Sequence, residues 1–127
     1  PMSVTMEFLS EQGLFFVDSR TTKYSKAEVI AKRSGVLSTK RNVFLDHTPS
    51  HEQIDKQFKR LIHLSKKYGY AVGIAHPYPQ TVEYLNVHLH KLQQHGITLV
   101  KLSDVVSSGA AYAYHPKPKL KPISPAL

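Results

Sequence analysis

The sequence alternates four short apolar segments with four stretches of helical periodicity, and this alternation restricts the fold more than any other feature. Short, nearly continuous apolar runs are typical of strands that are covered on both faces. Helices between successive buried strands favour right-handed crossovers and a parallel sheet. The strands are expected at Leu14–Val17, Asn42–Leu45, Ala71–Ala75 and Ile97–Leu102. The sequence therefore predicts an α/β fold with four parallel strands and four helices.

Capping residues mark the expected ends of the helices. Ser50 and Gln53 form a capping-box pattern at the start of a helix that Gly69 ends. Ser25 begins the same pattern for an earlier helix, and a further helix covers residues 2 to 12. The last helix is expected to begin after Thr81, whose hydroxyl can cap it, and to end at Gly96. Its inward side chains would be Val82, Leu85, Leu89 and Leu92.

The composition narrows the class of protein without identifying a function. A chain of 127 residues that is 41% hydrophobic suits one globular unit with a single core. No apolar run approaches the roughly 18 residues of a membrane span, so no transmembrane segment is expected. The absence of cysteine excludes disulfides and thiolate metal sites.

The charge is strongly basic, with 17 Lys and Arg against 9 Asp and Glu and a net charge of +8. A basic surface attracts polyanions, but the same composition suits an ordinary solvated surface. Part of the excess lies in residues 107–127, which are rich in Pro and Lys. Proline removes backbone donors, and this segment has little apolar surface to bury, so we expect a mobile tail there.

Ionisable side chains close the first three expected strands: Asp18, Asp46 and His76. In parallel α/β sheets, ligands bind at the carboxyl ends of the strands, so we expect these three side chains on one rim. Two carboxylates and an imidazole can supply a metal ligand, a general base and a general acid. The alternatives are a helix cap or turn for each aspartate and a core imidazole bonded to backbone for His76.

Further candidates lie beside these residues. Arg20 and Arg41 flank the first and second strand ends and would bind substrate, or else buttress the loops through ion pairs. His47 follows Asp46 and is a candidate for lining the pocket. Tyr78 lies in the loop after His76, which two prolines stiffen, and is a further candidate for substrate binding.

Three segments together resemble a known family: Phe16–Thr22, Arg41–His47 and Gly73–Thr81. They are similar, in order and spacing, to the last three motifs of the divergent polysaccharide deacetylase family. The segment from Gly96 to Ser103 also resembles the closing part of that family. The resemblance covers residues 1 to about 106, but Asn42 and His47 stand where the family more often has an acid and an amide.

The resemblance implies that residues 1–106 are the C-terminal half of a distorted (β/α) barrel. It implies a periplasmic or secreted hydrolase that removes acetyl groups from a polysaccharide or a peptidoglycan-like substrate. His76 would stand beside the leaving group, and Asp18 and Asp46 would be acidic residues of the pocket. A divalent metal, zinc, would be held partly by Asp18 and His76, with the remaining ligands upstream of Pro1, where the family has its early motifs.

Because those early motifs are missing, this chain alone is expected to be inactive. The alternative is a non-catalytic envelope protein that binds glycans or a partner. No helix-turn-helix, aromatic platform or zinc-finger pattern occurs, so no nucleic-acid partner is expected. A half-barrel exposes a strand edge and an apolar face, which predicts a homo-oligomer through that edge.

Overall fold

The computed structural model describes residues 2–20 and 26–106, which form a mixed α/β structure of two compact units. Of these residues, the first unit takes 2–20, 26–41 and 101–106, and the second takes 42–100. The expected tail at 107–127 and the expected cap Ser25 lie outside the described residues. Within the described part, no helix is long and apolar enough to cross a membrane.

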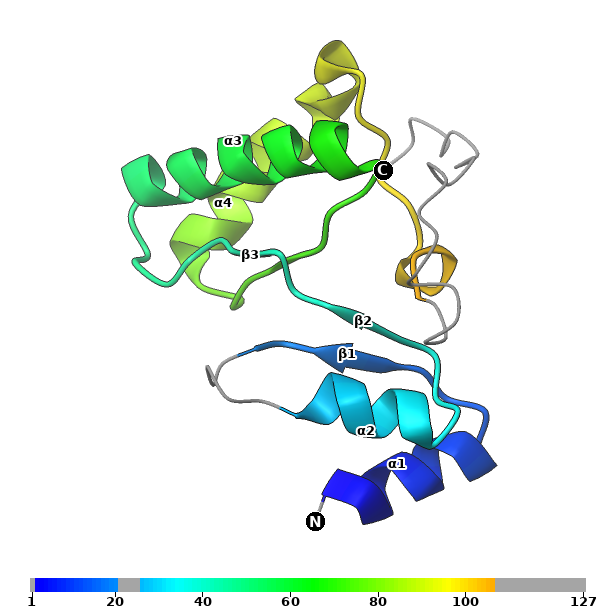
Figure 1. Ribbon diagram of the computed structural model, residues 1–127. Helices are drawn as coiled ribbons and strands as arrows, with labels where there is room; N and C mark the ends of the chain where they lie inside the picture. The colour runs from blue at the N-terminus through cyan, green and yellow to red at the C-terminus, as the bar shows by residue number, and fades with distance from the viewer. Residues whose placement is uncertain (1, 21–25, 107–127) are drawn as a thin grey trace. The chain divides into compact units, whose positions relative to one another are not determined.

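The first unit is built on a pair of parallel strands, β1 (Phe16–Asp18) and β2 (Ser38–Lys40). Helix α2 (Ala27–Arg33) lies beside this pair, and α1 (Met2–Glu11) packs against α2, as Figure 1 shows. The short 3-10 helix η2 (Leu102–Asp104) also belongs to this unit. Its core consists of buried side chains of α1, α2 and the segment that precedes β2: Met6, Ala27, Ala31 and Val36.

The second unit has a second parallel pair, β3 (Val43–Phe44) and β4 (Gly73–Ile74). Helix α3 (His51–Tyr68) connects the two strands, and α4 (Pro79–His88) packs against it. Helix α4 continues into the 3-10 helix η1 (Leu89–His95), as Figure 1 shows. The core of this unit consists of buried side chains from β3 and the residue after it, from α3, from α4 and from η1: Val43, Leu45, Ile54, Phe58, Tyr84 and Leu92.

The predicted ends of α3 are confirmed. The Ser50 hydroxyl accepts a hydrogen bond from the Gln53 amide at 3.3 Å, and Gly69 ends the helix with a φ of 94°. Glycine adopts this left-handed conformation without the steric cost that a side chain would add. Gly73 has a different role, because a Cβ there would come within 2.8 Å of Leu61 Cδ2. The missing side chain lets α3 pack closely on β4.

Two strand assignments differ from the sequence prediction. Ile97–Leu102 was expected as a strand, but residues 97–101 have no regular structure and η2 begins at Leu102. Ile97 instead donates its amide to the Leu92 carbonyl at 3.1 Å, closing the end of η1, and it packs on the core. Conversely, the polar run Ser38–Lys40 forms β2 because it pairs with β1. Strand formation depends on an available partner backbone as well as on apolar character.

The start of α4 also differs from the prediction. The helix begins at Pro79 rather than after Thr81, because proline fits the first helical position, where no amide hydrogen is needed. Of the residues expected to face inward, Leu92 is buried and Leu85 and Leu89 pack on the core. Thr81 and Tyr84 face inward, whereas Val82, expected to be buried, is 46% exposed. The described residues therefore show four α-helices and short parallel strands, and the closure of a barrel stays a prediction.

Candidate active site

Among the described residues, a hydrogen-bonded polar site in the second unit centres on the Asp46 carboxylate. Parallel pairing between β3 and β4 extends to Leu45, whose amide donates to the Ile74 carbonyl at 2.9 Å. This bond places Asp46, the next residue, beside the chain that leaves β4 towards His76. The side chain of Asp46 is fully buried, with the residue 1% exposed. A buried carboxylate needs hydrogen-bond donors to offset its lost hydration.

Three donors meet this carboxylate. Oδ2 accepts from the His76 main-chain amide at 2.7 Å and from the Thr81 hydroxyl at 2.7 Å. Oδ1 lies 3.0 Å from Nδ1 of His76. Bonds to a charged acceptor are stronger than neutral ones, so this arrangement fixes the position of Asp46 tightly.

The same bonds explain the ionisation of Asp46. Burial by itself raises the pKa of this carboxyl group, because it disfavours the charged form. The hydrogen bonds from Thr81 and His76 outweigh burial and hold the pKa of Asp46 below its usual value of 3.8. At neutral pH the group is therefore a carboxylate that accepts from all of its partners.

A carboxylate that only accepts determines the tautomer of His76. Nδ1 must carry the proton that it donates to Asp46, which leaves Nε2 as the nitrogen available for chemistry. The imidazole side chain is 49% exposed, although its partner is buried. One edge of the ring is thus anchored in the protein, and the ring remains accessible to a ligand.

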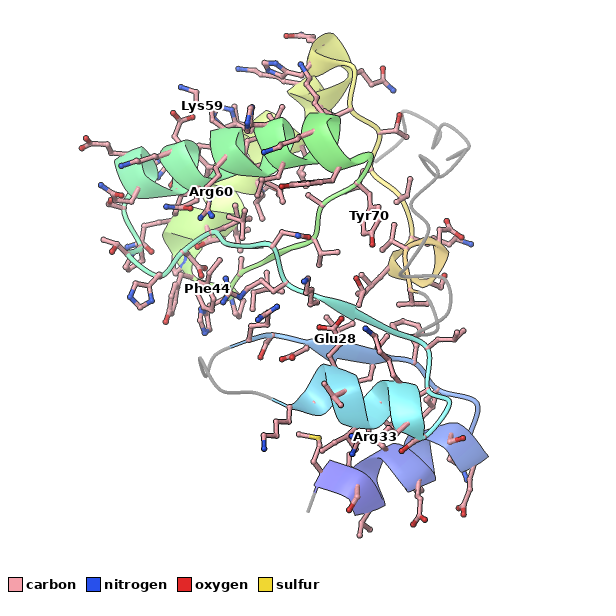
Figure 2. The ribbon with its side chains drawn as sticks, in the orientation of Figure 1. Glu28, Arg33, Phe44, Lys59, Arg60 and Tyr70 are labelled. Atoms are coloured by element: carbon pink, nitrogen blue, oxygen red, sulfur yellow. The ribbon has the colours of Figure 1, made fainter. Side chains whose placement is uncertain are left out.

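Aromatic rings pack around this imidazole. Tyr78 stacks on it with ring centroids 5.0 Å apart, and Phe44, labelled in Figure 2, approaches it at 5.2 Å. The ring of His47 meets the edge of Phe44 at 6.0 Å and is exposed. The second unit therefore brings together Asp46, His47, His76 and Tyr78, all of them candidates from the sequence.

The remaining candidates lie in the first unit, around the turn that follows β1. Asp18 is buried, and its Oδ1 accepts from the Arg20 amide at 2.8 Å. Arg20 has a left-handed backbone with a φ of 52°. Arg41 donates from Nε to the Ser19 carbonyl at 2.5 Å and from Nη2 to the Arg20 carbonyl at 2.9 Å.

These bonds give Arg41 a supporting role in the turn, through main-chain carbonyls. Substrate binding by Arg20 and Arg41 stays a prediction. The structure brings Asp18, Arg20 and Arg41 together in one unit and groups Asp46 with His76 in the other. That Asp18 and His76 lie on the same edge of one parallel sheet also stays a prediction.

Neither unit supplies, among its described residues, the set of ligands that a zinc ion requires. A catalytic zinc site typically has three protein ligands and an open position. Among residues 2–20 and 26–106, no group of three or more His, Asp or Glu side chains is placed to hold a metal. Both oxygens of Asp46 already accept hydrogen bonds, so Nε2 of His76 is the available ligand atom of this pair. The described residues do not fit a metal site by themselves.

Thr81 is the residue of this site that sequence analysis missed. We expected it to cap α4, but its hydroxyl bonds to Asp46 instead. The signal was present in the sequence, because Pro79 two residues earlier is the preferred first residue of a helix. A threonine at the third helical position is no longer needed as a cap, and its hydroxyl can serve another group.

Comparison with known proteins gives consistent matches. The family described as divergent polysaccharide deacetylase matches residues 1–106. An uncharacterized protein of Haemophilus influenzae is 42% identical over 93 residues, which are 73% of this chain and 33% of that protein. The uncharacterized protein YibQ of Escherichia coli is 37% identical over 106 residues, which are 84% of this chain and 33% of that protein.

The chain thus spans about a third of the length of the curated relatives that it matches. A crystal structure of the uncharacterized protein ATU2773 from Agrobacterium tumefaciens C58 superposes with a TM-score of 0.78 and 22% identity. That superposition covers 80% of this chain and 42% of the other, and it supports a shared fold.

Proposed function

The chain belongs to the divergent polysaccharide deacetylase family, and from this premise we propose that the whole protein hydrolyses acetyl groups on a polysaccharide. The observation that carries the proposal is the exposed imidazole of His76, oriented by a buried, ionised Asp46. An imidazole with one nitrogen fixed and the other accessible is the arrangement that general acid–base catalysis requires. A peptidoglycan-like polymer is the proposed substrate class.

The hydrolysis forms a C–O bond between water and the acetyl carbon and breaks the bond to the sugar nitrogen. The departing amine needs a proton, and we assign that proton to Nε2 of protonated His76. Asp46 holds the ring through Nδ1 while Thr81 holds Asp46, so the donor nitrogen keeps a constant direction. Tyr78 and Phe44 restrict the tilt of the ring.

The other candidate residues have supporting parts in this proposal. Asp18 is the carboxylate assigned to take a proton from the attacking water. His47 and Tyr78 lie close enough to the imidazole cluster to contact a sugar bound there. Arg20 and Arg41 are assigned to sugar oxygens near Asp18, in addition to the support that Arg41 gives the turn.

A divalent metal, zinc, belongs to the same proposal for the whole protein, with Asp18 as a candidate ligand. His76 would be a ligand only if another group is the general acid, because its Nδ1 is bonded to Asp46 and Nε2 cannot hold zinc and donate a proton at once. A bound zinc would polarise the acetyl carbonyl and activate water. We assign no step to it, because the described residues do not complete a metal site. A periplasmic or secreted location is likewise proposed, since polysaccharide substrates of this kind lie outside the cytoplasm.

Replacing His76 with Ala in the whole protein tests the proposal. Loss of general-acid help is expected to lower kcat by roughly 10²–10⁴-fold on an acetylated chito-oligosaccharide. His95→Ala removes an exposed imidazole from η1 and is the matched control, with kcat unchanged. Acetate release, melting temperature and zinc content are measured on both variants.

The measurements separate the possible roles of His76. Unchanged melting temperature and zinc content with a low kcat support the general acid. Loss of zinc makes His76 a ligand and requires a different acid. Glycan binding without acetate release by the wild-type protein favours a non-catalytic glycan-binding protein and overturns the proposed hydrolysis.

A further inference from the structure

A band of basic side chains covers the exposed face of α3, away from the candidate active site. Helix α3 contributes them from six positions over less than four turns, and Figure 2 shows two of them, Lys59 and Arg60, projecting from the helix. All six side chains are on exposed residues. The band, called the α3 basic face below, consists of Lys56, Lys59, Arg60, His63, Lys66 and Lys67.

Helical geometry places these residues on one face. Side chains three and four positions apart are neighbours on a helix, which joins Lys56 to Arg60, Arg60 to His63 and His63 to Lys67. The opposite face of α3 carries Ile54 and Phe58, which are buried in the core. The cations therefore form one continuous surface directed to solvent.

The charges of this face are poorly balanced by acids. The acidic residues of α3 are Glu52 and Asp55, and both precede the basic face. Asp55 pairs with Lys59 at 2.8 Å. From Lys56 to Lys67 the helix contains no Asp or Glu. Within α3 itself, therefore, most of this face has no neighbouring acid to balance its charge.

This arrangement destabilises the isolated helix. Like charges at i,i+4, such as Lys56 with Arg60, repel each other. The helix dipole favours cations in the last turn, which accounts for Lys66 and Lys67. It does not account for Lys56 or Arg60, which lie in the second and third turns. An anionic partner would offset this repulsion, because its negative charges would attract the same side chains.

We propose that the α3 basic face binds an acidic polysaccharide, and the proposal rests on the proposed function, because the family acts on polysaccharides. Tyr68, which is 56% exposed, lies at the end of the face with the Lys67 ammonium 5.2 Å from its ring centroid. An exposed aromatic ring beside cations suits a sugar ring that carries carboxylates. The face lacks exposed Leu, Ile, Phe or Trp side chains for insertion into lipid, which argues against a membrane surface.

The experiment compares two triple variants of the same charge. Lys56→Gln/Arg60→Gln/Lys67→Gln removes three cations from the α3 basic face. Lys26→Gln/Arg33→Gln/Lys101→Gln removes three exposed cations from the first unit and is the control. Binding of each variant and of the wild-type protein to polygalacturonate is titrated over a range of salt concentrations, with a neutral glucan, duplex DNA and anionic phospholipid vesicles as parallel probes.

We expect the α3 variant to lose about tenfold in affinity for polygalacturonate and the control to lose less than about twofold, in the range of exposed ion pairs. The wild-type protein should bind polygalacturonate more tightly than the neutral glucan, DNA or vesicles. Equal losses in both variants, or no binding, would overturn the proposal. Preferential binding of DNA or vesicles would assign the face to a different partner and overturn it as well.

This outcome is independent of the test of catalysis. Binding by the α3 basic face is measured as affinity, whereas the proposed hydrolysis is measured as acetate release in the His76→Ala comparison. A failed titration with intact His76-dependent turnover refutes only the basic-face proposal. Salt-sensitive binding without turnover refutes only the hydrolysis.

Discussion

The two units each contain a buried aspartate after a short parallel strand, but the two carboxylates have different surroundings. Asp18 accepts from the Arg20 amide two residues away and shapes a local turn. Asp46 accepts from His76 and Thr81, which follow it by 30 and 35 residues. The same sequence pattern therefore produces a turn in one unit and an oriented imidazole in the other. What decides between them is which donors the fold brings to the strand end.

The largest expected difference between the two aspartates is in the free energy of unfolding when each is replaced with Asn. Asp46→Asn loses a charged acceptor, so we expect the free energy of unfolding to fall by about 2 kcal/mol. Asp18→Asn should cost less than about 1 kcal/mol, because an Asn oxygen can accept from the Arg20 amide in the same turn. Urea denaturation of both variants measures the difference.

Asp46→Asn should also move the proton of His76 from Nδ1 to Nε2, since the Asn amide can donate to Nδ1. Nitrogen NMR of the imidazole distinguishes the two tautomers. Equal destabilisation by the two substitutions, with the tautomer unchanged, would show that the surroundings of Asp46 have no special effect.

The pH dependence of the free energy of unfolding gives a second test of the surroundings of Asp46. The pKa of Asp46 is lower in the folded protein than its usual value of 3.8, because hydrogen bonds outweigh burial. The ionised group therefore stabilises the fold above that usual value, and this stabilisation is lost as the pH falls through the folded pKa. The stability difference between wild type and Asp46→Asn should shrink as the pH falls below about 4. Urea titrations at each pH measure this, and a difference that grows on acidification would contradict it.

Thr81→Val tests the bond that supports Asp46. Valine has a similar shape but no hydroxyl, so we expect a loss of about 1–2 kcal/mol in the free energy of unfolding. Thr81→Ser keeps the donor and is the control, with a smaller loss from the missing methyl group. If Ser and Val cost the same, the hydroxyl bond contributes nothing and packing explains the residue.

Arg20→Gly gives the smallest expected change in stability. Its left-handed φ of 52° is costly for a residue with a side chain, so glycine should stabilise the turn by a few tenths of a kcal/mol after its own entropic cost. If Arg20 also binds substrate, the variant should gain stability while its KM rises. Unchanged KM would remove Arg20 from the substrate site.

The sequence predicted the structure correctly where the outcome depends on residues that are adjacent in the chain. The cap at Ser50 and the stop at Gly69 both depend on adjacent backbone groups, and the structure shows both of them. Features that depend on distant partners were missed. Ser38–Lys40 became a strand through pairing with β1, and Ile97–Leu102 did not become one despite its apolar character.

The candidate site shows the same division. Strand ends placed Asp46 and His76 near each other in the prediction, and the structure bonds them directly. The part played by Thr81 was missed because the helix begins two residues earlier, at Pro79, so that Thr81 is not its cap and its hydroxyl bonds to Asp46. The relation of Asp18 to this pair depends on how the two units are arranged and stays a prediction.

The bonds that span 30 and 35 residues have a consequence for folding. Closing loops of this length costs chain entropy before any bond can offset it. Helix α3 occupies most of the interval, so we expect it to form and pack before Asp46 meets His76. We therefore expect the oriented imidazole to be among the last features of its unit to form. A nascent or partly folded chain would carry all the residues of the site without the geometry that makes them reactive.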